Sequence, residues 1–150
     1  MPYEELNKGR YSEPHRLYFV TSVLDNRDEA LFRRFLLARY VVAEMRYLHQ
    51  AGVVDSLAWV VMPDHLHWLL VLNDVQTLGQ MMKGLKGRSA RRINDVLGRE
   101  GAVWQRAYYD HALRKEEDVK HVARYIVANP LRAGLVERLG DYPLWDAKWV

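Results

Sequence analysis

Short apolar runs bounded by turn residues mark four predicted β-strands. Residues 16–24 are rich in aromatic and β-branched side chains, and residues 53–62 and 65–72 are two further apolar runs. The last two are joined by only a Pro-Asp pair, which predicts that they are antiparallel neighbours. Residues 103–114 give the fourth predicted strand.

Two intervening stretches repeat their apolar positions at steps of three and four, the period of an amphipathic helix. In the first, Asp28 is the predicted N-cap and Gly52 follows the helix end. The second opens at Thr77, whose spacing from Gln80 matches a capping box. The predicted buried stripes are Leu31, Phe35, Ala38, Val42 and Met45 in the first helix, and Leu78, Met82, Leu85, Ile93 and Val96 in the second.

A last helix is predicted over residues 116–129, where Val119, Val122 and Ile126 share one face. Pro130 sets its end, because the residue before a proline resists the α conformation. The order β-α-β-β-α-β plus a C-terminal helix predicts an α+β protein with the ferredoxin-like, split βαβ arrangement. Two helices would cover one face of the antiparallel sheet, and the other face would be open to the last helix and a site. We expect one domain over 1–150, with an N-terminal arm (1–15), a core (16–129) and a C-terminal wrap (130–150).

The composition is that of an ordinary soluble globular protein, with 49% hydrophobic and 27% charged residues. The 22 lysines and arginines stand against 19 aspartates and glutamates, a net charge of +3. Cysteine is absent, which excludes disulfides and thiolate metal ligands. No apolar run approaches the ~20 residues that cross a bilayer, and the first residues do not resemble a signal peptide. We therefore expect a cytoplasmic protein.

Two histidines lie at the start of the third predicted strand. His65 and His67 are two residues apart, so in a strand their side chains point to the same face. Leu66, Trp68, Leu70 and Leu72 take the opposite face, toward a core. Two adjacent imidazoles can share one metal ion, although satisfied core histidines are an equally good interpretation of this motif alone.

The second predicted helix is unusually basic. It has no acidic residue between Val75 and Asn94. Its cations are Lys83, Lys86, Arg88, Arg91 and Arg92, and they spread over the side opposite the buried stripe. Gly84 and Gly87 fall on that side too, and each costs the helix about 1 kcal/mol relative to alanine. This cost indicates that another group approaches the helix backbone closely at these positions. A solvated basic face is the plain alternative, but a phosphate backbone is the favoured interpretation.

The last predicted helix presents Tyr125 and Asn129 on one face, together with His121. A phenol with a pKa near 10 is a weak nucleophile at neutral pH, and a divalent ion can polarise the phosphodiester that it attacks. Two imidazoles leave such an ion under-coordinated, and Asn129 offers a neutral oxygen. Mg²⁺ prefers oxygen ligands, so a histidine pair makes Mn²⁺ a competent alternative. Packing at the edge of the core is the plain alternative for a tyrosine taken alone, but the pattern as a whole favours phosphoryl transfer by a tyrosine.

Three blocks of sequence carry a family resemblance. They are residues 61–67 (VMPDHLH), residues 103–106 with 109–111 (VWQR and YDH), and residues 125–130 with 133–136 (YIVANP and AGLV). In this order and spacing they resemble the single-tyrosine HUH transposases, and most of all the REP-associated tyrosine transposases. The resemblance runs from about the first predicted strand to Val136.

The resemblance implies specific roles for these residues. His65 and His67 would be the HUH metal pair, Tyr125 the nucleophile, and Asn129 a third ligand where relatives often have glutamine. The family cuts single-stranded DNA beside hairpins with Mg²⁺ or Mn²⁺, through a 5′-phosphotyrosine intermediate, and the resemblance implies action on repetitive extragenic palindromes. Relatives differ in whether two subunits exchange their tyrosine helices, so a monomer and a homodimer both stay open.

Further DNA contacts are predicted outside the basic helix. Arg106 and Arg114 alternate with Trp104 onto one face of the fourth predicted strand and would border a DNA path. Arg132 follows Tyr125 closely enough to contact a phosphate. Tyr108 and Tyr109 fall on opposite faces of that strand, so at most one of them can face the site. Either could stack on a DNA base, but simple packing is the favoured interpretation for both.

Two other functions stay open on sequence alone. A non-catalytic protein that binds DNA hairpins would keep the fold and the basic helix without cutting. A metal-dependent hydrolase of small phosphoesters is the weaker alternative, because no glutamate stands near the histidine pair to activate water.

Overall fold

The computed structural model describes residues 15–113 and 116–148. Most of the predicted N-terminal arm and the predicted DNA contact Arg114 therefore lie outside the described residues. No helix in the described part of the chain is both long enough and apolar enough to cross a membrane.

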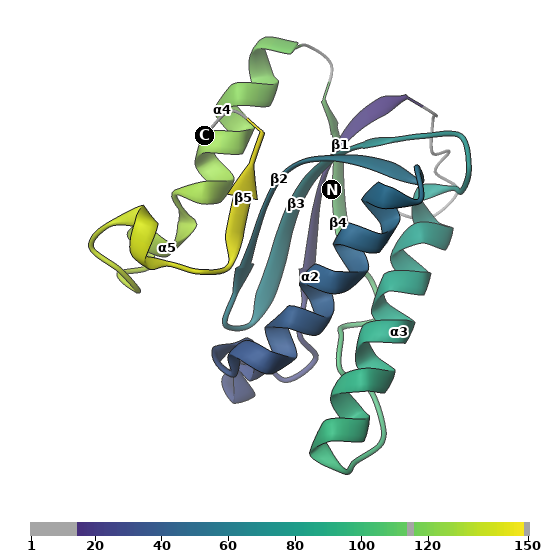
Figure 1. The fold of residues 1–150 in the computed structure, drawn as a ribbon, viewed down its shortest axis with the longest axis vertical. Helices are drawn as coiled ribbons and strands as arrows, with labels where there is room; N and C mark the ends of the chain where they lie inside the picture. Colours follow the sequence, from purple (N-terminus) through teal and green to yellow (C-terminus); the bar gives the residue numbers. More distant parts are fainter. Residues whose placement is uncertain (1–14, 114–115, 149–150) are drawn as a thin grey trace.

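A five-stranded antiparallel sheet with the strand order β4-β1-β3-β2-β5 forms the centre of the molecule (Figure 1). The strands are β1 (Arg16–Val23), β2 (Val54–Met62), β3 (His65–Leu72), β4 (Tyr109–Leu113) and β5 (Trp145–Ala147). The first four have the order of the split βαβ arrangement, so the predicted α+β fold is confirmed. The two-residue connection joins β2 and β3 as antiparallel neighbours, with Met62 opposite His65.

The two edges of the sheet differ from the prediction. The fourth strand begins at Tyr109 rather than at residue 103, and before it Trp104 forms only a single bridge with Leu24. The intervening carbonyls of Gln105 and Ala107 accept hydrogen bonds from the Lys86 ammonium instead of pairing in a ladder. On the other edge, β5 extends the sheet beyond β2 within the predicted C-terminal wrap, after a short 3₁₀ turn, η3 (Leu139–Asp141). Three residues are too few for a recognisable period.

Helices α2 (Phe35–Gln50) and α3 (Leu78–Leu97) cover one face of the sheet, as predicted (Figure 1). Trp68 and Leu70 of β3 are fully buried in this core, among the side chains of both helices. The capping box is present, because the Gln80 N–H donates to Thr77 Oγ1 and the Thr77 N–H donates to Gln80 Oε1.

The start of α2 corrects the prediction. Two 3₁₀ turns, η1 (Arg27–Glu29) and η2 (Leu31–Arg33), take the place of the first helical turns, and Asp28 is not an N-cap. Phe32 is buried against Trp104, with ring centroids 5.3 Å apart, while Phe35 is 49% exposed. At the end of α3, Val96 is also exposed rather than part of the stripe.

The opposite face of the sheet is covered by α4 (Glu116–Val127). Val119, Ala123 and Ile126 pack there against β2, β3 and β5. Pro130 does not end helical structure as predicted. It lies in the first turn of α5 (Asn129–Arg132), where a residue without an N–H is tolerated.

Candidate active site

His65 and His67 project from β3 onto the face of the sheet that α4 covers. Their ring centroids are 4.6 Å apart, so the two imidazoles are neighbours, as their spacing predicts. Both rings are partly buried, while Leu66 and Trp68, which alternate with them, are completely buried on the other face. The strand therefore offers one polar pair on an otherwise apolar surface.

The His65 ring is oriented by a chain of charged groups. Its Nδ1 lies 2.7 Å from Asp64 Oδ1, and Asp64 Oδ2 accepts a hydrogen bond from Arg27 Nε, also at 2.7 Å. Burial of Asp64 opposes ionisation, but the hydrogen bonds from His65 and Arg27 hold the pKa of the carboxyl below its usual value. An ionised carboxylate only accepts, so His65 donates to it through Nδ1–H, and Nε2 is the ring nitrogen left for a metal ion.

The His67 ring is held by Thr21 of β1, whose Oγ1 lies 2.7 Å from His67 Nδ1. Burial, reinforced by electrostatic interactions with His65 and Arg132, lowers the pKa of His67 to about 3, against the opposing effect of Asp64. His67 is therefore neutral at physiological pH, which is the form that binds metals. When Nδ1 donates to the threonine oxygen, Nε2 is free as a ligand atom.

This arrangement fits a divalent metal ion. Metal-binding histidines usually donate through their second ring nitrogen to a carboxylate or another oxygen, as His65 does to Asp64 and as His67 does in the tautomer that carries the proton on Nδ1. In the described part of the chain no cluster of three His, Cys, Asp or Glu side chains can hold an ion, so a further oxygen is needed. Asn129 is the candidate, and among the described residues its buried amide nitrogen has no hydrogen-bond partner, a sign of an amide whose surroundings are incomplete.

Tyr125 reaches this face from α4. The buried side of the helix packs on the sheet, and Tyr125 lies at its edge with 49% of its surface exposed. Phe19 of β1 links the two parts of the site, because its ring centroid lies 5.3 Å from that of His67 and 6.5 Å from that of Tyr125. Residues far apart in the sequence thus meet on one face of the sheet.

Arg132 contacts Tyr125 twice. Its guanidinium carbon lies 4.0 Å from the centroid of the Tyr125 ring, and Nη2 donates to the Tyr125 carbonyl oxygen at 2.8 Å. The sequence predicted only a phosphate contact for this arginine. Arg132 reaches Tyr125 because the chain turns between α4 and α5. The sequence predicted one helix up to Asn129 and did not predict this break.

Sequence reasoning also missed the residues that orient the histidines. Asp64 was interpreted only as part of a turn, although it directly precedes His65. The composition of residues 16–24 predicts a strand that includes Thr21, but the position of Thr21 opposite His67 follows only once β1 and β3 are paired. A hydroxyl among the apolar residues of β1 was the signal available.

Tyr109 and His111 of β4 extend the same face of the sheet. Tyr109 pairs with Thr21 and is 48% exposed, and His111 pairs with Phe19 and is exposed. Tyr108 lies before the strand and packs on the helical side, where the Lys86 ammonium is 5.5 Å from its ring centroid. Of the two tyrosines, Tyr109 is therefore the one that a DNA base can reach from the site.

The basic helix α3 packs on the face of the sheet opposite to the one that carries the histidine pair. Its cations are not equivalent. Burial lowers the pKa of Lys86 to about 8, and its ammonium donates to the carbonyls of Gln105 and Ala107. Arg92 stacks over Tyr40, with its guanidinium carbon 4.6 Å from the ring centroid. Lys83, Arg91 and Arg106 are exposed, and no side-chain contact of theirs is found within the described residues.

Arg88 explains one of the two glycines in α3. It forms an ion pair with the nearly buried Glu44 at 2.5 Å, and its guanidinium lies against the backbone of Gly84, where an added Cβ would stand 2.8 Å from Nη1. The close approach that Gly84 predicted is therefore made by a side chain of the same helix. A Cβ at Gly87 would meet nothing within 4 Å.

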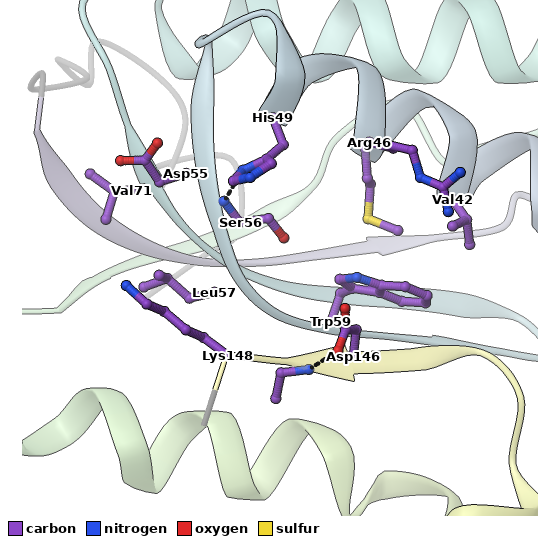
Figure 2. Close-up of a pocket in the computed structure, with 12 residues that line it drawn as sticks. Val42, Arg46, His49, Asp55, Ser56, Leu57, Trp59, Val71, Asp146 and Lys148 are labelled. Atoms are coloured by element: carbon purple, nitrogen blue, oxygen red, sulfur yellow. Dashed lines mark hydrogen bonds between the residues drawn. The ribbon is translucent and has the colours of Figure 1, made fainter. Parts of the chain in front are cut away.

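A cavity of about 670 Å³ lies away from this site, between α2 and the β2–β5 edge (Figure 2). Arg46, His49 and Trp59 line it, with Asp146 and Lys148 from the C-terminal segment. His49 Nδ1 is already used there, because it accepts a hydrogen bond from the Ser56 N–H at 3.0 Å. None of the predicted site residues lines this cavity.

Comparisons with known proteins agree with the geometry. The family described as "Transposase IS200 like" matches residues 17–129. The REP-associated tyrosine transposase of Escherichia coli (strain K12) is 24% identical over 128 residues, which cover 84% of this chain and 72% of that protein. A solved structure of a REP-associated tyrosine transposase bound to a REP hairpin is 25% identical, with a TM-score of 0.73 over 91% of this chain and 79% of that one. A bacterial tRNA(His) guanylyltransferase-like protein in complex with ATP shares the fold alone, at 13% identity and a TM-score of 0.50 over 83% of this chain and 59% of its own.

Proposed function

Because the chain belongs to the IS200-like transposase family, we propose that it cuts and rejoins single-stranded DNA beside hairpins, with Tyr125 as the nucleophile. The chain is a transposase, as are the relatives that it matches. One observation carries the proposal for the site. Phe19 contacts both His67 and Tyr125, so the proposed nucleophile and the proposed metal ligands lie on one face of the sheet within a single chain.

The proposed reaction is a transesterification at phosphorus. The phenol oxygen of Tyr125 loses its proton to solvent and forms a bond to the scissile phosphorus, while the bond from phosphorus to the 3′ oxygen breaks and that oxygen gains a proton. The product is a 5′-phosphotyrosine and a free 3′-hydroxyl. Attack by a 3′-hydroxyl on the same phosphorus reverses the step, so cleavage and joining need no ATP.

The residues present suit a metal-assisted version of this step. His65 and His67, through Nε2, and Asn129 would hold a divalent ion, Mg²⁺ or Mn²⁺, that polarises the scissile phosphodiester. Asp64 and Thr21 keep the two rings in the orientation that this role needs. The neutral state of His67 supports ligand binding without competition from protons at physiological pH.

The partner that we propose is a hairpin with a single-stranded flank, of the REP type. Support comes from the solved relative, which holds a REP hairpin. Lys83 and Arg91 are exposed on α3, and Arg106 is exposed on the loop that joins α3 to β4. These three cations offer phosphate contacts along α3 and the loop that follows it. Lys86, Arg88 and Arg92 are engaged within the protein, and their predicted role in DNA binding stays a prediction.

A hairpin-binding protein without catalysis is the second candidate. The separation of α3 from the histidine face favours it, because DNA binding on one side does not require chemistry on the other. Such a protein would tolerate Tyr125→Phe without loss of any function.

A covalent-adduct assay separates the two candidates. Wild type, Tyr125→Phe and the control Tyr109→Phe are mixed with labelled hairpin DNA from palindromes near the gene, with Mn²⁺ or EDTA, and run on a denaturing gel. The proposal predicts a shifted, EDTA-sensitive band in wild type and Tyr109→Phe but not in Tyr125→Phe. Tight hairpin binding without a band in wild type would support the non-catalytic protein instead.

A further inference from the structure

The two contacts of Arg132 suggest a role beyond a phosphate contact. We propose that Arg132 is a positioning residue, which holds the ring and the backbone of Tyr125 so that the phenol faces the histidine pair. This inference rests on the proposed function of Tyr125 as the nucleophile.

The first contact fixes the ring. Tyr125 is half-exposed, and an exposed tyrosine ordinarily samples several rotamers. Here the Arg132 guanidinium stacks on the ring at 4.0 Å, the shortest cation–ring contact in the described part of the chain, and Phe19 meets the ring edge at 6.5 Å. A guanidinium over the face of an aromatic ring is attracted to it even at exposed sites, so this contact favours one rotamer of Tyr125.

The second contact fixes the backbone of the same residue. The last carbonyls of a helix lack intrahelical donors, and arginine side chains near a C-terminus can supply them. Arg132 donates to the Tyr125 carbonyl oxygen at 2.8 Å from α5. The chain breaks helical continuity at Ala128, between α4 and α5, and Arg132 folds back across this break. One guanidinium therefore holds both parts of the nucleophilic residue.

The two contacts of Arg132 also require more than a positive charge. A guanidinium has five N–H donors in a planar fork, so it can stack, donate to a carbonyl and still have donors free. A lysine at this position would keep the positive charge but lose the planar stack. If Arg132 acted only by attracting phosphate, lysine would replace it well, and the main effect of its removal would be on DNA affinity.

The test separates the rate of the chemical step from binding. Wild type, Arg132→Met, Arg132→Lys and the control Arg138→Met are compared by single-turnover adduct formation at saturating hairpin DNA with Mn²⁺, and by hairpin Kd. Arg138 is an exposed arginine of the same C-terminal segment, whose side chain lies 3.8 Å from Asp141. Misplacement of a reacting group by about 1 Å costs on the order of 100-fold in rate. We therefore expect Arg132→Met to lose roughly 10- to 100-fold in the saturated rate, with Kd within about threefold of wild type.

Three further results are expected, one of them in an additional variant, Arg132→Ala. Arg132→Lys should resemble Arg132→Met rather than wild type, and added guanidinium should partly restore the rate of Arg132→Ala. Arg138→Met should behave as wild type in both measurements.

Other outcomes would overturn the inference. A raised Kd with an unchanged saturated rate would make Arg132 a phosphate contact alone, and wild-type values in all variants would leave it as a helix cap. If Arg132→Met fails to fold by circular dichroism, a wild-type rate in Arg132→Lys overturns the proposal by itself. Absence of an adduct from wild type overturns the proposed function itself, and is visible before any Arg132 variant is compared.

Discussion

At the scale of single residues, the histidine pair depends on neighbours that carry no metal-binding motif of their own. Asp64 accepts a hydrogen bond from His65, and Thr21 lies within hydrogen-bond distance of His67. These contacts occupy Nδ1 of each ring, so Nε2 is the ring nitrogen left for a metal ion. Arg27 completes the chain by donating to Asp64.

Asp64→Asn tests the orienting role of this carboxylate. The amide removes the negative charge that favours the Nδ1–H form of His65, so we expect Mn²⁺ affinity to fall by about 10- to 100-fold, as for other partners of metal-binding histidines. Isothermal titration calorimetry measures the change. Asp95→Asn, an exposed carboxylate of α3, is the control and should bind as wild type does. Equal affinities in the two variants would show that Asp64 does not support a metal site.

The burial of His67 predicts how stability depends on pH. Its pKa is about 3 in the folded protein, below its ordinary value of 6.5. Between these values the unfolded chain binds a proton that the folded protein does not, so the free energy of unfolding decreases as the pH falls below 6.5. Urea unfolding at several values between pH 4 and 7 should show this slope, and it should be shallower in His67→Gln. An unchanged slope in that variant would assign the acid sensitivity to other groups.

At the scale of elements, local patterns gave the centre of the fold and tertiary contacts set its edges. The alternation in β3 predicted its bounds and both of its faces, and Thr77 with Gln80 predicted the start of α3. The start of α2 was missed because Phe32, two residues into a 3₁₀ turn, fills the core in place of Phe35. Periodicity cannot show which of two nearby phenylalanines the core accepts.

The same limit applies to the candidate site. His65, His67 and Tyr125 were predicted from their residue types and spacing, and the structure brings them to one face. The roles of Thr21 and Phe19 depend on which strands pair and in what register. That information appears only after the sheet is assembled.

Lys86 links α3 to the loop before β4, and its removal should destabilise the protein. In Lys86→Met the carbonyls of Gln105 and Ala107 lose a donor in a partly buried place, which costs about 1–3 kcal/mol for a group left unsatisfied. Chemical denaturation measures the free energy of unfolding. Lys83→Met is the matched control on the same helix, where the side chain is exposed, and it should be close to neutral. Equal effects of the two changes would contradict the structural role of Lys86.

At the scale of the whole molecule, the sheet separates two surfaces. One carries the histidines, Tyr125 and Tyr109, and the other carries α2 and α3 with their arginines. The β4 edge is where these surfaces meet, because the loop with Arg106 connects α3 to β4. A hairpin bound at this edge would place its single-stranded flank near the histidine face.

If the proposed site is complete within one chain, Tyr125 acts beside its own histidines. His67→Ala and Tyr125→Phe each lack one part of the site, so a mixture of the two co-expressed proteins should form no DNA adduct. Denaturing gels with labelled hairpin DNA measure the adduct, and each variant co-expressed with wild type serves as the control. Restored adduct in the mixture would show that two subunits exchange their tyrosine helices.

The most direct test of the whole account is to identify the residue that becomes linked to DNA. Wild-type protein is incubated with hairpin DNA and Mn²⁺, the adduct is digested with protease and nuclease, and the nucleotide-bearing peptide is sequenced by mass spectrometry. The account predicts a nucleotide joined through its 5′ phosphate to the oxygen of Tyr125. Attachment to Tyr109, the other exposed tyrosine on the histidine face, or to any other residue would contradict it.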